Sequence, residues 1–280
     1  MVKRRMIDQC DVCGGAGFSL KYKDNGLHSD IVKCTNCGFV FSNPQVEKDY
    51  RNNSKYIKHH LKAELGRRLT DRWRLSQVPV PSGKLLEIGC SIGLFLDEAR
   101  EVGFDVVGLE LNEEARGYAK EQLGLEVRGE DLYHTEFKDR FDVVAMFNVL
   151  EHVPCPSEFL TFIRENLLAE NGIIVIEVPN IFTVQGSLAR NKHAHFQYAH
   201  YSYYSKKTFE LLAEKSGLKV DSFAYGRRIY PLGQSASVFL RRYQKLSRWV
   251  QGGLQGLGLE DRVVEIGFRE FLFFVCRNNT

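Results

Sequence analysis

The stretch that decides the fold is Lys84-Leu-Leu-Glu-Ile-Gly-Cys-Ser-Ile-Gly-Leu-Phe-Leu96. It begins with a short apolar run, which is typical of a strand covered on both faces. Gly89 and Gly93 bracket the turn that follows, where a side chain would stop a ligand from approaching the backbone. The apolar residues 94–96 begin a helix whose N-terminal N–H groups point back at the turn. The stretch therefore predicts a strand, a ligand-binding glycine turn and a helix.

A second strand, expected at residues 105–109, ends in an acid, Glu110. A carboxylate at this place can accept hydrogen bonds from both ribose hydroxyls of a nucleoside. Strands and helices alternate through this region, with further strands expected near 125–128, 141–146 and 172–178 and helices at 93–102, 113–122 and 157–168. This alternation predicts a parallel sheet that is covered by helices on both faces.

The spacing Glu87-x-Gly89-x-Ser91-x-Gly93 resembles the E/D-x-G-x-G-x-G signature of class I S-adenosylmethionine (SAM) methyltransferases, with Ser91 in place of the middle glycine. The resemblance implies a Rossmann-like sheet of seven mostly parallel strands, with SAM as the cofactor. It also implies a set of cofactor-binding residues, namely Glu87, Gly89, Ser91, Gly93, Glu110, Leu111, Asp131, Leu132 and Asn148. In this family an acid at the position of Asp131 bonds the adenine amino group, and a plain loop aspartate is the alternative.

A second informative stretch is Phe141-Asp-Val-Val-Ala-Met-Phe-Asn-Val-Leu-Glu-His-Val153. Its strand ends at Asn148, at the edge where open α/β sheets place their ligands. The following Leu150-Glu-His-Val153 resembles the L-E-H-V element of small-molecule methyltransferases. Some relatives carry E-x-x-E-H here and bind a divalent metal, but Asn148 replaces the first glutamate of that motif. His152 has two interpretations, a catalytic role and a structural hydrogen bond to the backbone.

An unusual run of histidines and tyrosines follows, His193-Ala-His-Phe-Gln-Tyr-Ala-His-Tyr-Ser-Tyr-Tyr-Ser205. Its end resembles the H-E-H-[FY]-S-Y-[FY]-S segment of zinc-containing sugar C-methyltransferases, in which the second histidine is the base. That histidine corresponds to His200, whereas Tyr198 and Ala199 replace the first histidine and the glutamate. We therefore expect His200 to be the general base, with His152 second and Glu151 orienting them. The alternative is that His200 packs beside Ser205, the expected cap of a helix at 206–216.

Two C-x-x-C pairs near the N-terminus, Cys10/Cys13 and Cys34/Cys37, are each followed by a glycine. Two such pairs can supply the four thiolates of a closed tetrahedral Zn²⁺ site, and a small module of this size needs such a staple. A redox dithiol or unrelated core cysteines are the alternatives. Four thiolates leave no open coordination position, so we expect a structural rather than a catalytic zinc.

These signals divide the chain into a zinc ribbon (1–43), a helical connector and cap (44–82) and a methyltransferase domain (83–280) with a helical insertion at 231–262. In the connector, Tyr50 and Tyr56 are candidates to reach the ligand or to pack under the cap. Its basic run, Arg67, Arg68, Arg72 and Arg74, could meet a phosphate or form a solvated face. A basic amphipathic helix at 234–251 could touch a membrane or an acidic partner, but packing on the domain's own surface is the expectation.

The composition is that of an ordinary globular protein, with 44% hydrophobic and 26% charged residues among 280. The net charge of +3 is too small to argue for a nucleic-acid partner. The N-terminus does not resemble a signal peptide, no apolar run is long enough for a membrane span, and the remaining cysteines are scattered. We therefore expect a cytoplasmic protein.

The expected function is transfer of a methyl group from SAM to a small molecule, such as the hydroxyl of a sugar, a nucleotide-linked sugar or a related metabolite. One alternative is an rRNA methyltransferase with a zinc ribbon. Another is a SAM-binding or zinc-ribbon adaptor without turnover. The sequence leaves open the acceptor, the accepting atom, a second metal near Glu151, His152 and His200, and the oligomeric state.

Overall fold

The computed structural model describes most of the chain, namely residues 4–24, 28–47, 49, 51, 57, 61, 64–183, 186, 188, 195–196, 200–233, 235, 244–266 and 269–279. Tyr50, Tyr56, His193, Tyr198 and Ala199, which the sequence singled out, lie outside these residues.

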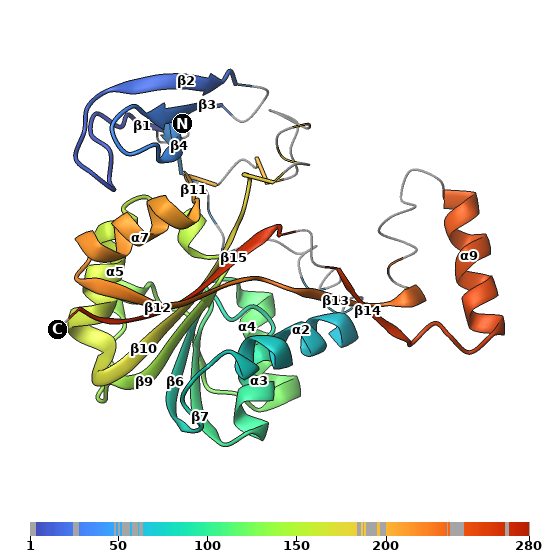
Figure 1. Ribbon diagram of the computed structural model, residues 1–280. Helices are drawn as coiled ribbons and strands as arrows, with labels where there is room; N and C mark the ends of the chain where they lie inside the picture. The colour runs from blue at the N-terminus through green and yellow to red at the C-terminus, as the bar shows by residue number, and fades with distance from the viewer. Residues whose placement is uncertain are drawn as a thin grey trace.

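A seven-stranded sheet forms the centre of the molecule (Figure 1), with strand order β12-β15-β10-β9-β6-β7-β8. Its strands are β6 (Gly83–Ile88), β7 (Phe104–Leu109), β8 (Val127–Arg128), β9 (Phe141–Phe147), β10 (Leu168–Pro179), β12 (Leu218–Tyr225) and β15 (Phe271–Asn278). β15 runs antiparallel to both of its neighbours, and the pairs from β10 to β8 are parallel. This sheet confirms the predicted fold class, a mostly parallel Rossmann-like sheet.

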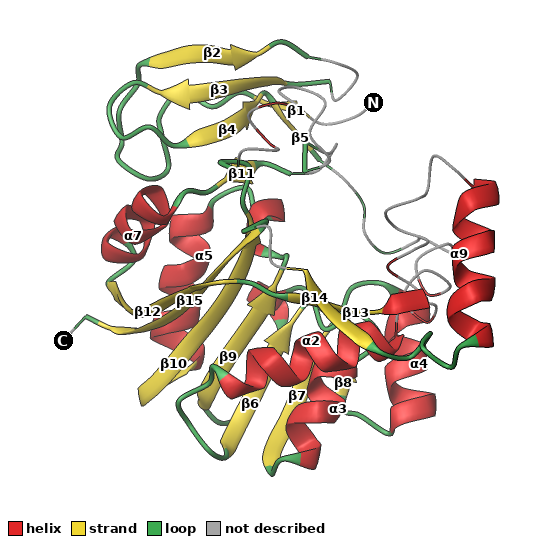
Figure 2. Cartoon of the chain, turned by 45° about the vertical axis from the view of Figure 1, so that its right-hand side comes forward, coloured by secondary structure: helices red, strands yellow, loops and turns green. Residues whose placement is uncertain are grey.

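Helices cover the sheet on both faces (Figure 2). One face carries α2 (Glu64–Ser76), α3 (Leu94–Glu101) and α4 (Glu113–Leu123), and the other carries α5 (Pro156–Phe162) and α7 (Lys206–Lys215). Neighbouring strand residues such as Leu85 and Leu86 belong to different core clusters, since successive side chains point to opposite faces. The helix expected at 157–168 ends earlier, because residues 163–167 form a π-helical turn before β10.

The N-terminal ribbon contains β2 (Phe18–Tyr22), β3 (Asp30–Cys34) and β4 (Val40–Asn43), while β1 (Arg4–Arg5) pairs with β5 (Gln45–Val46). A fourth strand, β11 (Ser202–Tyr203), completes this ribbon sheet by pairing antiparallel with β4. The ring of Phe39 lies 5.5 Å from that of Tyr204, and both belong to the core under the central sheet. The ribbon is therefore joined to the rest of the fold by a shared sheet and a shared core.

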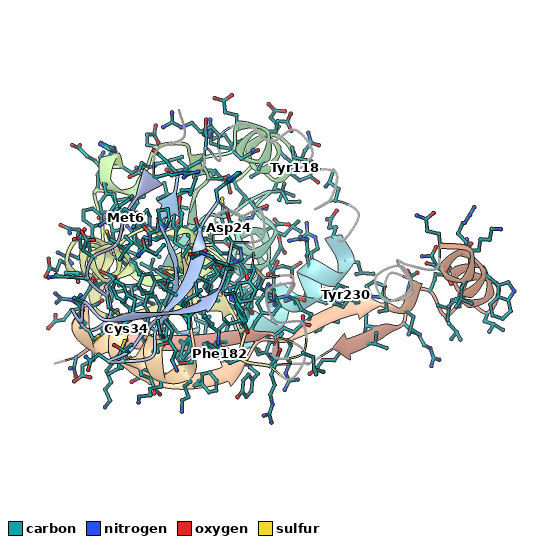
Figure 3. The ribbon with its side chains drawn as sticks, turned by 90° about the horizontal axis from the view of Figure 1, so that it is seen from above. Met6, Asp24, Cys34, Tyr118, Phe182 and Tyr230 are labelled. Atoms are coloured by element: carbon teal, nitrogen blue, oxygen red, sulfur yellow. The ribbon has the colours of Figure 1, made fainter. Side chains whose placement is uncertain are left out.

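An arm between β12 and β15 consists of β13 (Arg228–Pro231), β14 (Val263–Ile266) and α9 (Gln244–Gly256). The backbone N–H of Ile229 donates to Thr70 Oγ1 at 3.2 Å, which ties the start of the arm to α2. Helix α9 stands at the far end of the arm, away from the central sheet (Figures 1 and 3). The expected packing of this helix on the domain's own surface is wrong for the described residues, because Trp249 is 76% exposed.

Three further outcomes concern helices. The described part of α9 begins at residue 244 and ends at 256, so it extends beyond the expected 234–251 at its C-terminal end. Ser205 caps α7 as predicted, with its Oγ accepting from the N–H of Thr208. Within the described ranges, no helix is long and apolar enough to cross a membrane.

Candidate active site

The glycine turn follows β6 and has a left-handed backbone, with φ of 72° at Gly89, 55° at Ser91 and 81° at Gly93. A Cβ at Gly89 would lie 2.6 Å from Val149 Cγ2, and one at Gly93 would lie 2.6 Å from Leu125 Cδ1. The sequence related these glycines to ligand approach, but backbone conformation and close packing both require them.

Glu110 links the glycine turn to the next helix. Its Oε2 accepts from the N–H of Ser91 at 2.8 Å and its Oε1 from the N–H of Asn112 at 2.7 Å. Burial raises the pKa of this carboxyl, while the N–H bonds from Asn112 and Ser91 act in the opposite direction. Each carboxylate oxygen can accept more than one hydrogen bond, so capacity remains for ribose hydroxyls. The predicted role of Glu110 fits this geometry.

Glu87 and Asn148 lie at the carboxyl ends of adjacent strands. Glu87 is buried, and its Oε2 has no hydrogen-bond partner among the described residues. Burial and the charge of Asp71 raise its pKa well above the ordinary value. Asn148 has a left-handed φ of 58°, a conformation that asparagine adopts more readily than most other non-glycine residues. A buried oxygen without a partner, such as Glu87 Oε2, could bind a polar group of a ligand. The ligand expected here is SAM.

Asp131, Leu132 and Leu111 complete the predicted cofactor set. Asp131 is exposed and caps the short 3-10 helix at Leu132–His134, its Oδ1 accepting from the N–H of Tyr133 at 3.0 Å. Leu132 is buried in the core, and Leu111 is partly buried. The cap is a structural role for Asp131, and contact with adenine stays a prediction.

Glu151, His152 and His200 come together beside the end of β9. A 3-10 turn at Leu150–His152 carries the first two, and His200 approaches from a segment far along the chain. The two imidazole rings lie 4.7 Å apart at 82°, and one ligand atom from each of the three residues lies within 4.8 Å of the others. Imidazole and carboxylate groups at this separation can share a proton or a divalent cation.

The carboxyl group of Glu151 is fully enclosed. Neither of its oxygens has a hydrogen-bond partner among the described residues. Burial raises the pKa of Glu151 to about 8, so the neutral acid predominates at neutral pH. A neutral carboxylic acid can donate a hydrogen bond as well as accept one, which suits a group that orients an imidazole.

The ribbon holds His200 in this cluster. Ser42 Oγ donates to the carbonyl of His200 at 2.7 Å, and the N–H of Ser42 donates to the carbonyl of Tyr201 at 2.9 Å. On the other side, the N–H of Tyr201 donates to the carbonyl of Glu151 at 2.7 Å. The sequence analysis did not identify Ser42, because no local pattern links it to His200, which is 158 positions away.

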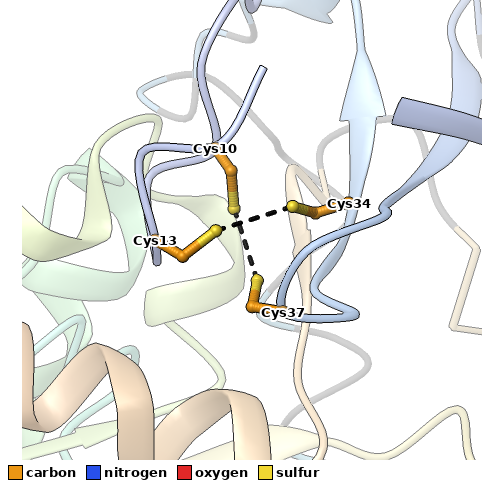
Figure 4. A group of neighbouring side chains, drawn as sticks. All are labelled: Cys10, Cys13, Cys34 and Cys37. Atoms are coloured by element: carbon orange, nitrogen blue, oxygen red, sulfur yellow. Dashed lines mark hydrogen bonds between the residues drawn. The ribbon is translucent and has the colours of Figure 1, made fainter. Parts of the chain in front are cut away.

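The four cysteines of the ribbon face one another (Figure 4). Cys10 Sγ lies 3.6 Å from Cys37 Sγ, and Cys13 Sγ lies 3.6 Å from Cys34 Sγ. All four sulfur atoms are within 4.8 Å of one another. Zn–S bonds of about 2.3 Å place tetrahedral sulfur ligands at such separations, so this donor set fits Zn²⁺.

A buried ion cluster lies on the other side of the central sheet from the ribbon core. Glu177 in β10 is fully buried and accepts from Arg74 of α2 and from Arg228 of β13, the latter at 2.7 Å. Burial alone would raise the pKa of Glu177, but the two guanidinium groups outweigh it and lower the pKa to about 2. The basic run of α2 is therefore not simply a solvated face. Arg68 and Arg72 both pair with Glu98, and Arg68 also pairs with Glu64 and Asp97.

The glycine turn after β6, Glu110 after β7 and the polar cluster at the end of β9 fit an α/β protein that binds a nucleoside. Residues 57–222 match the family model described as "Methyltransferase domain" (Methyltransf_23). This match spans more than half of the chain, and the chain belongs to this methyltransferase family.

Similar proteins agree with this assignment. The ubiquinone biosynthesis O-methyltransferase of Cereibacter sphaeroides is 36% identical over 135 residues, which are 45% of this chain and 51% of the relative. The chain thus spans about half the length of the curated relatives it matches. A Haloferax volcanii methyltransferase in complex with the Trm112 methyltransferase activator matches with a TM-score of 0.55 and 13% identity over 81% of this chain and 95% of that one. Coclaurine N-methyltransferase bound to N-methylheliamine and SAH matches with a TM-score of 0.51 and 12% identity, over 82% and 75%.

Proposed function

We propose that this chain transfers a methyl group from SAM to a hydroxyl of a small molecule, with a histidine as the general base. The observation that carries this proposal is the convergence of Glu151, His152 and His200 beside Asn148. This cluster lies at the carboxyl end of β9, the edge where open α/β sheets bind their ligands.

SAM, when bound, supplies a methyl group that is already activated on a sulfonium, so the protein has to position the acceptor and remove its proton. We propose that Glu110 accepts from the ribose hydroxyls, and that Glu87 Oε2, which has no hydrogen-bond partner among the described residues, meets a polar group of the cofactor. Asp131 is the candidate for the adenine amino group.

His200 is the proposed base, and His152 is its neighbour within the cluster. A base at this place takes the hydroxyl proton as the oxygen attacks the methyl group. Glu151 is the proposed positioning residue, because its backbone carbonyl accepts from the N–H of Tyr201, next to His200, at 2.7 Å.

The acceptor is proposed to be a metabolite hydroxyl. The Cereibacter sphaeroides relative is an O-methyltransferase of ubiquinone biosynthesis, which supports oxygen as the accepting atom. Tyr198 and Ala199 replace the histidine and glutamate of the sugar C-methyltransferase segment, which argues against identical C-methylation. The first candidates are therefore hydroxyls of sugars, nucleotide-linked sugars or related metabolites.

The test is transfer of radiolabelled methyl groups from SAM to panels of nucleotide-linked sugars, phenols and structured RNA. We expect turnover with a small hydroxyl compound, and a 10²–10⁴-fold loss of kcat in His200→Gln with SAM affinity retained. Full kcat in His200→Gln would overturn the assignment of the base. Turnover of RNA with steeply salt-dependent affinity would favour the rRNA alternative. SAM binding without turnover on any panel would favour an adaptor.

A further inference from the structure

Helix α9 exposes a stripe of large apolar side chains. Leu246 is 47% exposed, Trp249 is 76% exposed, and Leu257, which follows the helix, is 73% exposed. Residues 246 and 257 are three helical turns apart, and residue 249 lies beside the line that joins them. Among the described residues of α9, only Ser247 is buried. This stripe is therefore an apolar surface that the rest of the described fold does not cover.

Helix α9 carries basic but no acidic side chains, and the nearest acidic residues in the sequence, Glu260 and Asp261, follow Leu257. Residues 229–259 contain four basic side chains, Arg241, Arg242, Lys245 and Arg248, and no aspartate or glutamate. The net charge of this segment, +4, is larger than the net charge of the whole chain, +3. Lys245 and Arg248 are exposed on α9 itself, next to the apolar stripe. The surface thus combines an apolar stripe with a concentrated positive charge.

The arm presents this surface away from the body of the protein. Arg228 at the start of β13 is held by the fully buried Glu177, so the base of the arm is anchored in the central sheet. At the other end of the hairpin, Pro231 pairs with Val263, and Val263 is itself half exposed. Seen from above, α9 lies well to one side of the other elements (Figure 3).

We propose that α9 is a docking surface for anionic lipid bilayers. Trp249 and Leu246 would lie at the boundary between headgroups and acyl chains, a place that indole rings favour. Lys245 and Arg248 would lie near lipid phosphates, whose negative charge attracts basic side chains. Binding of this kind is reversible and depends on salt.

Charge decides between a bilayer and a second copy of the chain. Two copies that met through α9 would bring two concentrations of positive charge together, and α9 itself has no acidic residue to compensate. An acidic protein would match the charge, but α9 offers a convex single-helix stripe rather than a groove. A bilayer matches both the charge and the exposed indole. The proposal is independent of the acceptor of the methyl group.

The chain has two tryptophans, which permits a direct measurement. Trp73 is partly buried and packs on Phe273 at 5.3 Å, so Trp73→Phe leaves Trp249 as the only indole reporter. This full-length variant is titrated with vesicles of phosphatidylcholine alone and with vesicles that also contain phosphatidylglycerol. We expect a blue shift of the fluorescence and co-sedimentation with the anionic vesicles only, and reversal of both by high salt.

Charge reversal tests the same surface. Lys245→Glu/Arg248→Glu should weaken binding to anionic vesicles at least tenfold, which corresponds to about 1.4 kcal/mol. The control Lys207→Glu/Lys219→Glu changes two exposed lysines of α7 and β12 by the same total charge, and it should bind within about twofold of wild type. Circular dichroism shows whether each variant is folded.

Three outcomes would overturn the proposal. They are equal binding to neutral and anionic vesicles, equal loss in the α9 and control variants, and no binding to any vesicle by the folded wild-type chain. A dimer in analytical ultracentrifugation that Trp249→Ala abolishes would assign the stripe to a second copy instead. Because the readouts are lipid binding, failure of the proposed methyl transfer leaves them unaffected.

Discussion

Ser42 in the ribbon donates a 2.7 Å hydrogen bond from its Oγ to the backbone carbonyl of His200, the proposed base. The same serine uses its N–H to bind the carbonyl of Tyr201, and β4 pairs with β11 immediately beyond. Water does not readily replace either hydrogen bond, because Ser42 is buried. The position of the His200 backbone therefore depends on the ribbon.

Replacing Ser42 should disturb catalysis more than cofactor binding. A lost hydrogen bond to a buried carbonyl costs about 1–2 kcal/mol, so we expect Ser42→Ala to lower kcat roughly tenfold while the Kd for SAM changes less than about twofold. Ser42→Thr keeps the hydroxyl and should restore part of the rate. Ser19→Ala is a matched control, because Ser19 bonds the carbonyl of Lys33 at an exposed place in the same ribbon. A SAM affinity that falls in parallel with kcat would refute a specific effect on His200.

The ribbon should carry one structural zinc ion. We expect metal analysis of the purified chain to find about one equivalent, and Cys10→Ser to lose it, because three thiolates hold zinc less firmly than four. Cys10 also belongs to the core that contains Phe39 and Tyr204, so the variant should unfold at a lower temperature. Cys155→Ser, outside the cluster, should retain the metal. Wild-type protein that contains no zinc when prepared without chelators would contradict this prediction.

The buried acid Glu151 should make the stability of the fold depend on pH. Its pKa is about 8 in the folded chain and 4.5 for the ordinary group, so between these values the folded state holds a proton that the unfolded state has released. The free energy of unfolding therefore falls as the pH rises through this window. Glu151→Gln removes this loss, and relative to wild type it should gain roughly 3–5 kcal/mol between about pH 5 and about pH 8. Urea unfolding measures the difference, and a difference that does not change with pH would count against it.

The ion cluster at Glu177 should be sensitive to the loss of one cation. Arg228→Leu leaves a fully buried carboxylate with Arg74 as its remaining partner in the cluster, and we expect a loss of about 3–5 kcal/mol in the free energy of unfolding. The neighbouring Arg227→Leu removes an exposed pair with Glu265 and should cost less than about 1 kcal/mol. Equal effects of the two substitutions would show that the cluster is not a special source of stability.

Local patterns were sufficient to predict most of the central sheet. The strand and turn before Leu94 and the cap at Ser205 depend on residues within a few positions of one another, and the structure has them as expected. The cysteine cluster could also be predicted, because the spacing within each C-x-x-C pair is a local pattern. Such features follow from periodicity and turn chemistry, which a single sequence contains.

Features that depend on distant contacts were not visible. The Ser42–His200 bond and the Glu177–Arg228 pair join elements that are adjacent only after the chain has folded. The periodicity of residues 234–251 predicted an amphipathic helix, and the structure has one at 244–256. The periodicity could not predict whether another part of the fold would cover its apolar face. The exposed Trp249 shows that, in the described fold, none does.

The pairing of β11 with β4 also constrains how such chains can be recombined. An exchange of residues 1–43 between two homologues would transfer three strands of the ribbon sheet and leave the fourth behind in the recipient. The β4 strand of one homologue would then have to pair with the β11 strand of the other, next to the hydrogen bond that holds His200. Residues 10–43 and 200–204 therefore form one structural unit, although more than 150 residues separate them, and a functional chimera would have to exchange both segments together.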